Sequence, residues 1–261
     1  MSGLDLDAML IAADRAARAG GEIVRAHFGS PPDVREKAPG DWVTAADLAS
    51  EAAVREVLER ETGIAVFGEE FGGDRAETCW LVDPLDGTAN FVHGFPIVGV
   101  SVALVADGVP VVGVVHAPML GDVYSACIGR GAFHNGEPIQ VSARPSERGI
   151  CATGFPFRAK RQRLAEYLPV FERALRTFED LRRAGAASLD LAWTSAGVYD
   201  SYFEQNLGTW DVAAGALLVR EAGGVVTDWQ GDDRAWLESG DVVAGPPEVH
   251  TRLLALIAGD S

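Results

Sequence analysis

The sequence predicts an α+β or layered α/β protein, in which mixed sheets are sandwiched by helices. Three observations support this fold class. Apolar residues recur every three or four positions over residues 4–28, which is typical of an amphipathic helix. Over residues 97–134 the chain instead carries apolar runs separated by glycine-rich turns, which indicates strands. After Gly149, helical and strand-like segments alternate to the end of the chain.

The N-terminal elements follow from this periodicity and from the residues that interrupt it. The helix over 4–28 is followed by a proline-rich segment, 30–41, which we expect to be a loop. A second helix is expected over about 44–60, because Thr44 and Asp47 have the spacing of a capping box with Asp in place of Glu. The next two segments are expected to be strands that end at carboxylates, residues 64–67 and 79–82.

The middle and C-terminal elements complete the expected fold. The expected strands cover residues 97–105, 109–115, 123–126, 150–153, 200–204, 224–227 and 241–244. The expected helices cover residues 160–177, 187–198, 211–222 and 246–258. Because no linker is visible, we expect a single domain over residues 1–261 that can divide into two lobes, about 1–145 and 146–261.

The composition limits the function. The chain has 261 residues, of which 22 are basic and 38 acidic, and its formal net charge is −16. So acidic a chain is a poor general binder of nucleic acid or of anionic membrane, and we expect neither as a direct partner. Three cysteines without CxxC spacing indicate buried thiols in a reducing compartment. The N-terminus lacks a basic-then-apolar leader, and no run of about 18 apolar residues occurs, so we expect a cytoplasmic protein.

The densest concentration of chemistry lies in residues 79–90, Cys-Trp-Leu-Val-Asp-Pro-Leu-Asp-Gly-Thr-Ala-Asn. Asp83 ends a buried strand, Pro84 fixes a turn, and Asp86 follows on the same side of that turn. Thr88 opens a short helix, whose exposed backbone N–H groups can hold a phosphate. Two carboxylates beside an anion need positive charge between them, and Mg²⁺ supplies it, because it binds carboxylates, water and phosphate oxygens. Turn and capping roles for the two aspartates are the structural alternative.

Three other acidic motifs lie at the ends of expected elements. Glu69 and Glu70 follow a strand, and either a metal or solvent exposure explains two adjacent carboxylates. Asp211 opens an apolar helix, where it is either an N-cap or a third metal ligand. Asp47 lies in a helix-start motif, residues 41–47. Each motif is weak alone, but four motifs at element ends are hard to explain by structure only.

Together these motifs resemble those of the inositol monophosphatase family, within the superfamily of lithium-sensitive, Mg²⁺-dependent phosphatases. Two signatures carry the resemblance, Asp83-Pro-Leu-Asp-Gly-Thr88 with Asn90-Phe-Val-His-Gly-Phe-Pro96, and Trp210-Asp-Val-Ala-Ala-Gly215 with Glu221-Ala-Gly-Gly224. Other matches in order and rough spacing are Glu69-Glu70, residues 41–47 and Gly154-Phe-Pro-Phe157. The resemblance spans about residues 5–258 and implies a five-layer αβαβα sandwich and a homodimer.

The resemblance also implies the roles of individual residues. The implied metal ligands are Glu69, Asp83, the backbone carbonyl of Leu85, Asp86 and Asp211, which would hold two or three Mg²⁺ ions. The implied catalytic residues, which would orient a metal-activated water, are Glu70, Thr88 and Asp47. The implied substrate contacts are Asp86, Gly87, Thr88, Gly185, Ala187 and Glu204.

The expected substrate is a phosphomonoester of a polyol. In the family, the residue matching Glu204 binds ring hydroxyls, and a carboxylate accepts hydroxyl hydrogens. We therefore expect hydrolysis of myo-inositol monophosphate or a related polyol phosphate, with inhibition by Li⁺. Histidinol-phosphate phosphatases share the metal motifs, so histidinol phosphate is the alternative substrate. A regulatory or binding role is a second alternative, because some bacterial relatives act with the transcription machinery.

Three positions depart from the family pattern. Ala186 lies where many inositol phosphatases carry a hydroxyl side chain, which would remove one substrate contact. Ala89 replaces a common Thr beside the metal loop. The segment 37–47 is about one residue short of some relatives, which weakens any third-metal role of Lys37.

Overall fold

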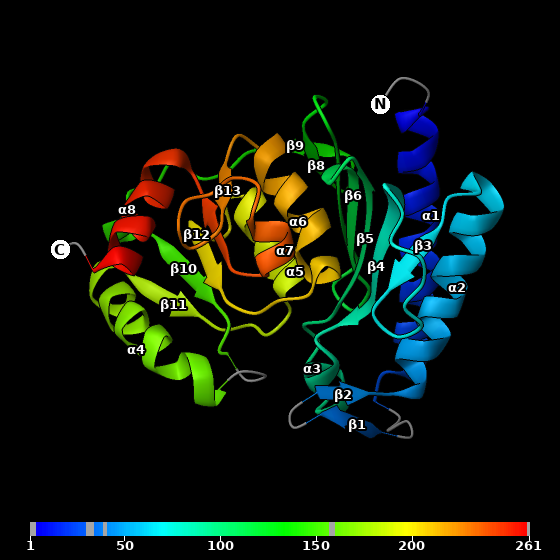
Figure 1. Ribbon diagram of the computed structural model, residues 1–261, viewed down its shortest axis with the longest axis horizontal. Helices are drawn as coiled ribbons and strands as arrows, with labels where there is room; N and C mark the ends of the chain where they lie inside the picture. The colour runs from blue at the N-terminus through cyan, green and yellow to red at the C-terminus, as the bar shows by residue number, and fades with distance from the viewer. Residues whose placement is uncertain (1–3, 30–33, 39–40, 157–159, 260–261) are drawn as a thin grey trace.

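A computed structural model describes residues 4–29, 34–38, 41–156 and 160–259. The chain forms five layers in the order helix, sheet, helix, sheet, helix (Figure 1). The helices are α1 (Leu6–His27), α2 (Ala45–Thr62), α3 (Thr88–Val92), α4 (Lys160–Thr177), α5 (Ala187–Ser195), α6 (Thr209–Glu221), α7 (Trp236–Ser239) and α8 (Pro247–Ala258). This architecture confirms the expected layered α/β sandwich.

The larger sheet has seven strands in the order β3-β4-β5-β6-β7-β8-β9. Its strands are β3 (Val66–Gly68), β4 (Thr78–Asp86), β5 (Gly99–Ala106), β6 (Val109–Ala117), β7 (Asp122–Cys127), β8 (Ala132–His134) and β9 (Glu137–Ile139). β3 and β4 are parallel, and every other neighbouring pair is antiparallel. One face packs on α1 and α2, and the other packs on α5 and α6 (Figure 1).

The smaller sheet has five strands in the order β11-β10-β12-β14-β13. Its strands are β10 (Ile150–Thr153), β11 (Asp180–Arg182), β12 (Ser201–Glu204), β13 (Val225–Thr227) and β14 (Val242–Gly245). α5 and α6 contact this sheet as well, so they form the middle layer, while α4 and α8 cover the outer face (Figure 1). The two sheets therefore share one helical layer, and residues from both halves of the chain meet there.

Strand β4 shows how side-chain alternation positions the site. Trp80 and Val82 pack in the core beneath α1 and α2, whereas Cys79 and Leu81 pack in the core that includes α5 and α6. Successive side chains of a strand point to opposite faces, so Asp83 follows Cys79 and Leu81 on the face toward the middle layer. The strand thus directs a buried carboxylate toward the start of α6.

The expected loop over 30–41 is partly wrong. Arg35–Ala38 forms strand β1, which pairs antiparallel with β2 (Asp41–Val43). The ladder gives these backbone groups hydrogen-bond partners, which the local proline and glycine signals did not reveal. Residues 30–33 and 39–40, which include Pro31, Pro32, Pro39 and Gly40, lie outside the described residues.

Five further short elements were not predicted, one of them a single 3₁₀ turn at Ser146–Arg148. Strands β8 and β9 are three residues each and form a hairpin through Asn135 and Gly136, whose φ angles are 50° and 86°. An Asn-Gly pair is a strong hairpin signal, so the sequence did contain this information. Strand β11 and helix α7 carry no comparable signal. Within the described ranges, no helix is long and apolar enough to cross a membrane.

Candidate metal and phosphate site

Three carboxylates from distant parts of the chain form a cluster. Glu69, Asp83 and Asp211 each offer one oxygen, and these atoms all lie within 4.8 Å of one another. β3 and β4 are parallel, with Gly68 opposite Val82, and the Glu69 N–H donates to the Val82 carbonyl at 3.1 Å. Glu69, which directly follows β3, therefore lies beside Asp83, the next residue of β4. These are three of the five predicted metal ligands.

Asp211 approaches the cluster from the first turn of α6. The N-cap of this helix is Gly208, whose N–H donates to Asp211 Oδ2 at 2.8 Å. Asp211 is therefore the third helical residue and not the N-cap, but it does cap the helix end through its side chain. One oxygen binds the helix terminus, and the carboxylate still reaches the cluster, so its capping and ligand roles are compatible.

The cluster is electrostatically strained without a cation. Burial raises the pKa of Asp83 well above its usual value, and the negative charges of Glu69, Asp86 and Asp211 raise it further. Carboxylate oxygens are the hard donors that Mg²⁺ prefers, and a divalent cation would relieve their mutual repulsion. The donor set and its charge therefore fit the Mg²⁺ that the resemblance implies.

Asp86 lies beside this cluster but is not part of it. Its Oδ2 accepts two hydrogen bonds from Ser188, one from the backbone N–H at 2.7 Å and one from Oγ at 2.5 Å. Burial raises the pKa of Asp86 to about 6, although the Ser188 hydrogen bonds oppose this shift. Ser188 was not predicted as a site residue. It is 102 positions away in sequence, and only the tertiary fold brings it to Asp86.

Thr88 and Asp47, to which the resemblance gives catalytic roles, are hydrogen-bonded to each other. Thr88 Oγ1 donates toward Asp47 Oδ1 at 2.9 Å and toward the Leu85 carbonyl at 3.1 Å. Asp47 Oδ2 accepts from the N–H of Thr44 at 2.8 Å and from its Oγ1 at 2.5 Å, which completes the expected capping box of α2. Burial raises the pKa of Asp47, and these hydrogen bonds lower it. One aspartate thus fixes both the helix start and the Thr88 hydroxyl.

Glu70 lies next to the cluster and pairs with Lys37. Lys37 Nζ lies 2.7 Å from Glu70 Oε1 and 3.2 Å from Glu69 Oε1. Burial raises the pKa of Glu70 to about 7, while the Lys37 hydrogen bond lowers it and the Glu69 charge raises it. Such a carboxyl group can exchange a proton near neutral pH.

Two residues of α2 hold the site loops and were missed by the sequence analysis. Glu51, which is fully buried, accepts hydrogen bonds from the N–H groups of Glu70 at 2.7 Å and Phe71 at 3.2 Å. Ser50 Oγ donates to the Pro84 carbonyl at 2.7 Å. With Asp47 they lie at helix positions i, i+3 and i+4 and share one face. That spacing is visible in the sequence and was the available signal.

The predicted substrate contact Glu204 lies at the end of β12. The Tyr202 hydroxyl donates to its Oε2 at 2.6 Å. A Cβ atom on Gly154 would lie 1.8 Å from the Glu204 carboxyl carbon, so the glycine leaves room for this side chain. Burial raises the pKa of Glu204 to about 7, and the positive charge of Arg183 opposes the shift. Phe157, from the Gly154–Phe157 motif, lies outside the described residues.

The remaining predicted substrate contacts come from two adjoining segments. Gly87 has φ 88°, and a Cβ there would lie 3.0 Å from the Ile97 carbonyl and 3.3 Å from the Gly185 carbonyl. Asn90 Nδ2 ties the segments together, because it donates to the carbonyls of Ile97 at 2.7 Å and Ala184 at 2.9 Å. Gly185 and Ala187 thus lie beside the turn that carries Gly87 and Thr88. The structure brings the predicted residues into one neighbourhood, and their roles stay predictions.

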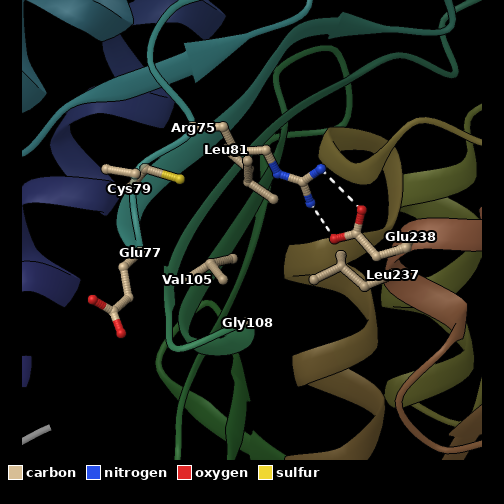
Figure 2. A pocket seen from close by; sticks show the side chains of 9 residues that line it. Arg75, Glu77, Cys79, Leu81, Val105, Gly108, Leu237 and Glu238 are labelled. Carbon is tan, nitrogen blue, oxygen red and sulfur yellow. Dashed lines mark hydrogen bonds and ion pairs between the residues drawn. The ribbon is translucent and has the colours of Figure 1, made fainter.

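A pocket elsewhere on the molecule is separate from this site. It lies at the start of β4, where Arg75 and Glu238 pair across it, with Nη1 and Oε2 2.9 Å apart (Figure 2). Its other lining residues include Cys79, Leu81, Val105 and Leu237. Cys79 precedes Asp83 by four residues along an extended strand, roughly 13 Å. The pocket is therefore at the other end of β4 from the carboxylates.

The fold and the site define a layered α/β protein whose clustered carboxylates suit a divalent cation. The chain matches the inositol monophosphatase family over residues 5–260. It belongs to the inositol monophosphatase family, a family of Mg²⁺-dependent phosphomonoesterases.

Individual relatives agree with this assignment. The chain is 42% identical over 259 residues to the protein named Nus factor SuhB of Pseudomonas aeruginosa. This alignment covers 95% of each of the two chains. Its structure resembles that of the extragenic suppressor protein suhB from Bartonella henselae, with TM-score 0.92, 34% identity and coverage of 96% and 98%. It also resembles the inositol monophosphatase of Anabaena, with TM-score 0.88, 32% identity and coverage of 98% and 97%.

Proposed function

We propose that this protein is a Mg²⁺-dependent phosphomonoesterase that hydrolyses myo-inositol monophosphate or a related polyol phosphate. The observation that carries the proposal is the cluster of Glu69, Asp83 and Asp211 beside the Thr88–Asp47 pair. Phosphoryl transfer depends on positioning and charge neutralisation more than on covalent help. A carboxylate cluster next to an oriented hydroxyl meets both needs.

The metal would be held by the predicted ligands Glu69, Asp83, Asp86, Asp211 and the Leu85 carbonyl, as two or three ions. When bound, it supplies charge neutralisation for the phosphate and acidifies the attacking water. Thr88 donates its own proton to Asp47 or to Leu85, so its lone pairs are free to accept a hydrogen bond from that water. Glu70, with a pKa of about 7, is placed to take up a proton near neutral pH.

The substrate side of the proposal depends on Glu204. Its carboxylate would accept hydrogen bonds from hydroxyl groups of the leaving alcohol, which favours a polyol over an added phosphate group. The backbone of Gly87 and Thr88 would contact the phosphate, and the segment with Gly185 and Ala187 would border the alcohol. Ala186, a buried residue of this segment, offers no hydroxyl, so the alcohol would be recognised with one polar side chain fewer than in many relatives.

A substrate panel tests the proposal. Phosphate release would be measured with Mg²⁺ and with EDTA on inositol 1-phosphate, glycerol 2-phosphate, histidinol phosphate, fructose 1,6-bisphosphate and adenosine 3′,5′-bisphosphate. We expect Mg²⁺-dependent release with inositol 1-phosphate preferred. A preference for histidinol phosphate would keep the metal chemistry and replace the substrate. No release from any of the five compounds would overturn the proposal.

A second role in transcription is favoured by one observation, the name Nus factor that relatives up to 42% identical carry. We infer that such a role would use a protein partner, because a net charge of −16 disfavours direct nucleic-acid contact. The protein would act as the homodimer that the resemblance implies. Co-purification of RNA polymerase or its elongation factors with the tagged protein would support the role, and their absence at high expression would contradict it. Light scattering of the purified protein would give its oligomeric state.

A further inference from the structure

We propose that Ser188 is a positioning residue that occupies one oxygen of Asp86 and thereby restricts Asp86 to binding a cation through its other oxygen. This restriction would make the site selective for Mg²⁺ over Ca²⁺. The inference rests on the proposed function, because it assigns Asp86 to the metal.

Two short hydrogen bonds from Ser188 reach the same oxygen of the Asp86 carboxylate. The backbone N–H and the hydroxyl of Ser188 both donate to Oδ2, at 2.7 and 2.5 Å. A carboxylate oxygen offers about two acceptor sites, so these donors saturate Oδ2. The backbone of Ala187 also approaches this carboxylate, and Oδ1 is the oxygen that would meet a cation. Asp86 and Ser188 are both buried, so water does not compete for these bonds.

The surrounding structure is shaped for the Ser188 hydroxyl. Asp86 pairs with Gly99 in the ladder between β4 and β5. A Cβ atom on Gly99 would lie 2.8 Å from Ser188 Oγ, closer than van der Waals contact allows. The hydroxyl therefore fits beside Asp86 because residue 99 lacks a side chain. Ala186, two positions earlier, has no hydroxyl. In this segment the hydroxyl that reaches the Asp86 carboxylate is that of Ser188.

The position in the fold strengthens the hold on Asp86. Ser188 is the second residue of α5, which is nine residues long, and its N–H is among those left without an intrahelical partner. The positive end of the helix dipole favours the charged form of a carboxylate placed there. Asp86 is therefore fixed by a helix end and a side-chain hydroxyl acting on the same oxygen.

Cation selectivity follows from this geometry. Mg²⁺ requires near-octahedral geometry and is typically bound through single carboxylate oxygens. Ca²⁺ takes six to eight oxygens in flexible geometry and commonly binds a carboxylate through both of them. With Oδ2 held by Ser188, Asp86 can serve the first pattern but not the second.

The test is calorimetric titration of the metal-free full-length protein with MgCl₂ and with CaCl₂, for wild type and Ser188→Ala. Removing a hydrogen bond that orients a metal-binding carboxylate typically weakens metal binding by about tenfold or more. For Ser188→Ala we expect roughly that loss of Mg²⁺ affinity at the site that includes Asp86, and a loss of Ca²⁺ affinity below about threefold. Ser195→Ala is the matched control, because it removes another buried hydroxyl of α5, one that donates to the Ala192 carbonyl. It should leave both affinities unchanged.

A second variant protects the test against misfolding. Gly99→Ala keeps the hydroxyl but crowds it, so it should also lower the Mg²⁺ affinity relative to that for Ca²⁺. The inference is overturned if Ser188→Ala and Gly99→Ala bind Mg²⁺ as wild type does, or if both cations weaken equally. Normal Mg²⁺ binding and turnover by wild type would, in that case, leave the proposed function standing. Wild-type protein that neither binds Mg²⁺ nor releases phosphate would overturn the proposed function itself.

Discussion

The two sides of the site are built differently. On the metal side, Asp47 accepts three hydrogen bonds, Asp86 accepts two from Ser188, and Glu70 pairs with Lys37. On the substrate side, the Glu204 carboxylate accepts one hydrogen bond within the described part of the chain, from Tyr202, and lies in the space left by Gly154. Behind it, the buried Asp190 has no hydrogen-bond partner among the described residues, and burial raises its pKa well above the usual range.

This difference separates the chemistry from the choice of substrate. Charged groups that are held by several partners suit a reaction that needs fixed positions. Groups held by one partner or none are positioned mainly by the shape of their surroundings. A substitution at a single residue such as Ala186 or Gly154 would therefore change how the substrate side binds the alcohol. We therefore expect mutations on the metal side to affect turnover most, and those on the substrate side to affect affinity and preference.

The largest effect should come from Asp83→Asn. Loss of Asp83, a proposed metal ligand, should lower kcat for inositol 1-phosphate by at least about 100-fold. This exceeds the typical effect of losing a residue that only hydrogen-bonds to a ligand. The metal-free protein should become more stable, by about 1 kcal/mol, because a buried and repelled charge is removed. Phosphate release and thermal unfolding in EDTA would measure the two effects. A variant that is both inactive and less stable would indicate misfolding and contradict this account.

Thr88→Ala should have the next largest effect. Without its hydroxyl the attacking water loses an orienting partner, and we expect kcat to fall by roughly 100-fold with little change in KM. Steady-state kinetics over a range of substrate concentrations would separate the two constants. Thr194→Ala removes a different threonine hydroxyl, which is buried and donates to the Asp190 carbonyl, and serves as the control. A change confined to KM would show that Thr88 binds substrate instead.

A smaller effect is expected from the ionisation of Glu204. Its pKa is raised to about 7, so the carboxylate becomes a full acceptor for hydroxyl groups only as the pH rises through 7. The KM for inositol 1-phosphate should therefore fall, by roughly threefold to tenfold, between pH 6 and pH 8. Glu204→Gln should remove this dependence, while phenyl phosphate, which lacks hydroxyl groups on its alcohol, should not show it in wild type.

The same ionisation should appear in stability, with the opposite sign to that of a salt-bridged acid. A raised folded pKa means that the folded state binds the proton more tightly than the unfolded state does. The stability from Glu204 is then present below pH 4.5 and lost as the pH rises through about 7.

Gly154→Ala, which places a Cβ atom against the Glu204 carboxylate, should raise KM as Glu204→Gln does. The double variant should have a KM no higher than that of either single variant.

The smallest effect is expected far from the site. Arg75→Ala breaks the ion pair with Glu238 that crosses the pocket between the two halves of the chain (Figure 2). Both side chains are exposed, so the loss of stability should stay below about 1 kcal/mol, and kcat should not change. Chemical denaturation and the standard assay would measure both. A large loss of turnover would show that the pocket is coupled to the site.

The residues of the metal side could be singled out in the sequence because they lie in short contiguous motifs at element ends, while their metal and catalytic roles came from the resemblance and stay predictions. Thr44 and Asp47 belong to one helix start, where local rules placed them correctly. The turn expected at Pro84 was wrong, because β4 continues through Asp86 with a shift in register between Asp83 and Asp86. The partners that hold them could not be predicted in the same way. Ser188 reaches Asp86, and Gly154 makes room for Glu204, only after sheets and helices have packed. The prediction of a loop over residues 30–41 was partly wrong for a related reason, because pairing of β1 with β2 overrode the local turn signals.

The most direct test of this account is a Mg²⁺ titration in which binding and phosphate release are followed on the same preparation of wild type and Asp83→Asn. The account predicts that release from inositol 1-phosphate rises as the carboxylate cluster fills with Mg²⁺, and that the variant shows neither tight binding nor release. Release that continues in EDTA, or Mg²⁺ binding that is unchanged in Asp83→Asn, would contradict it.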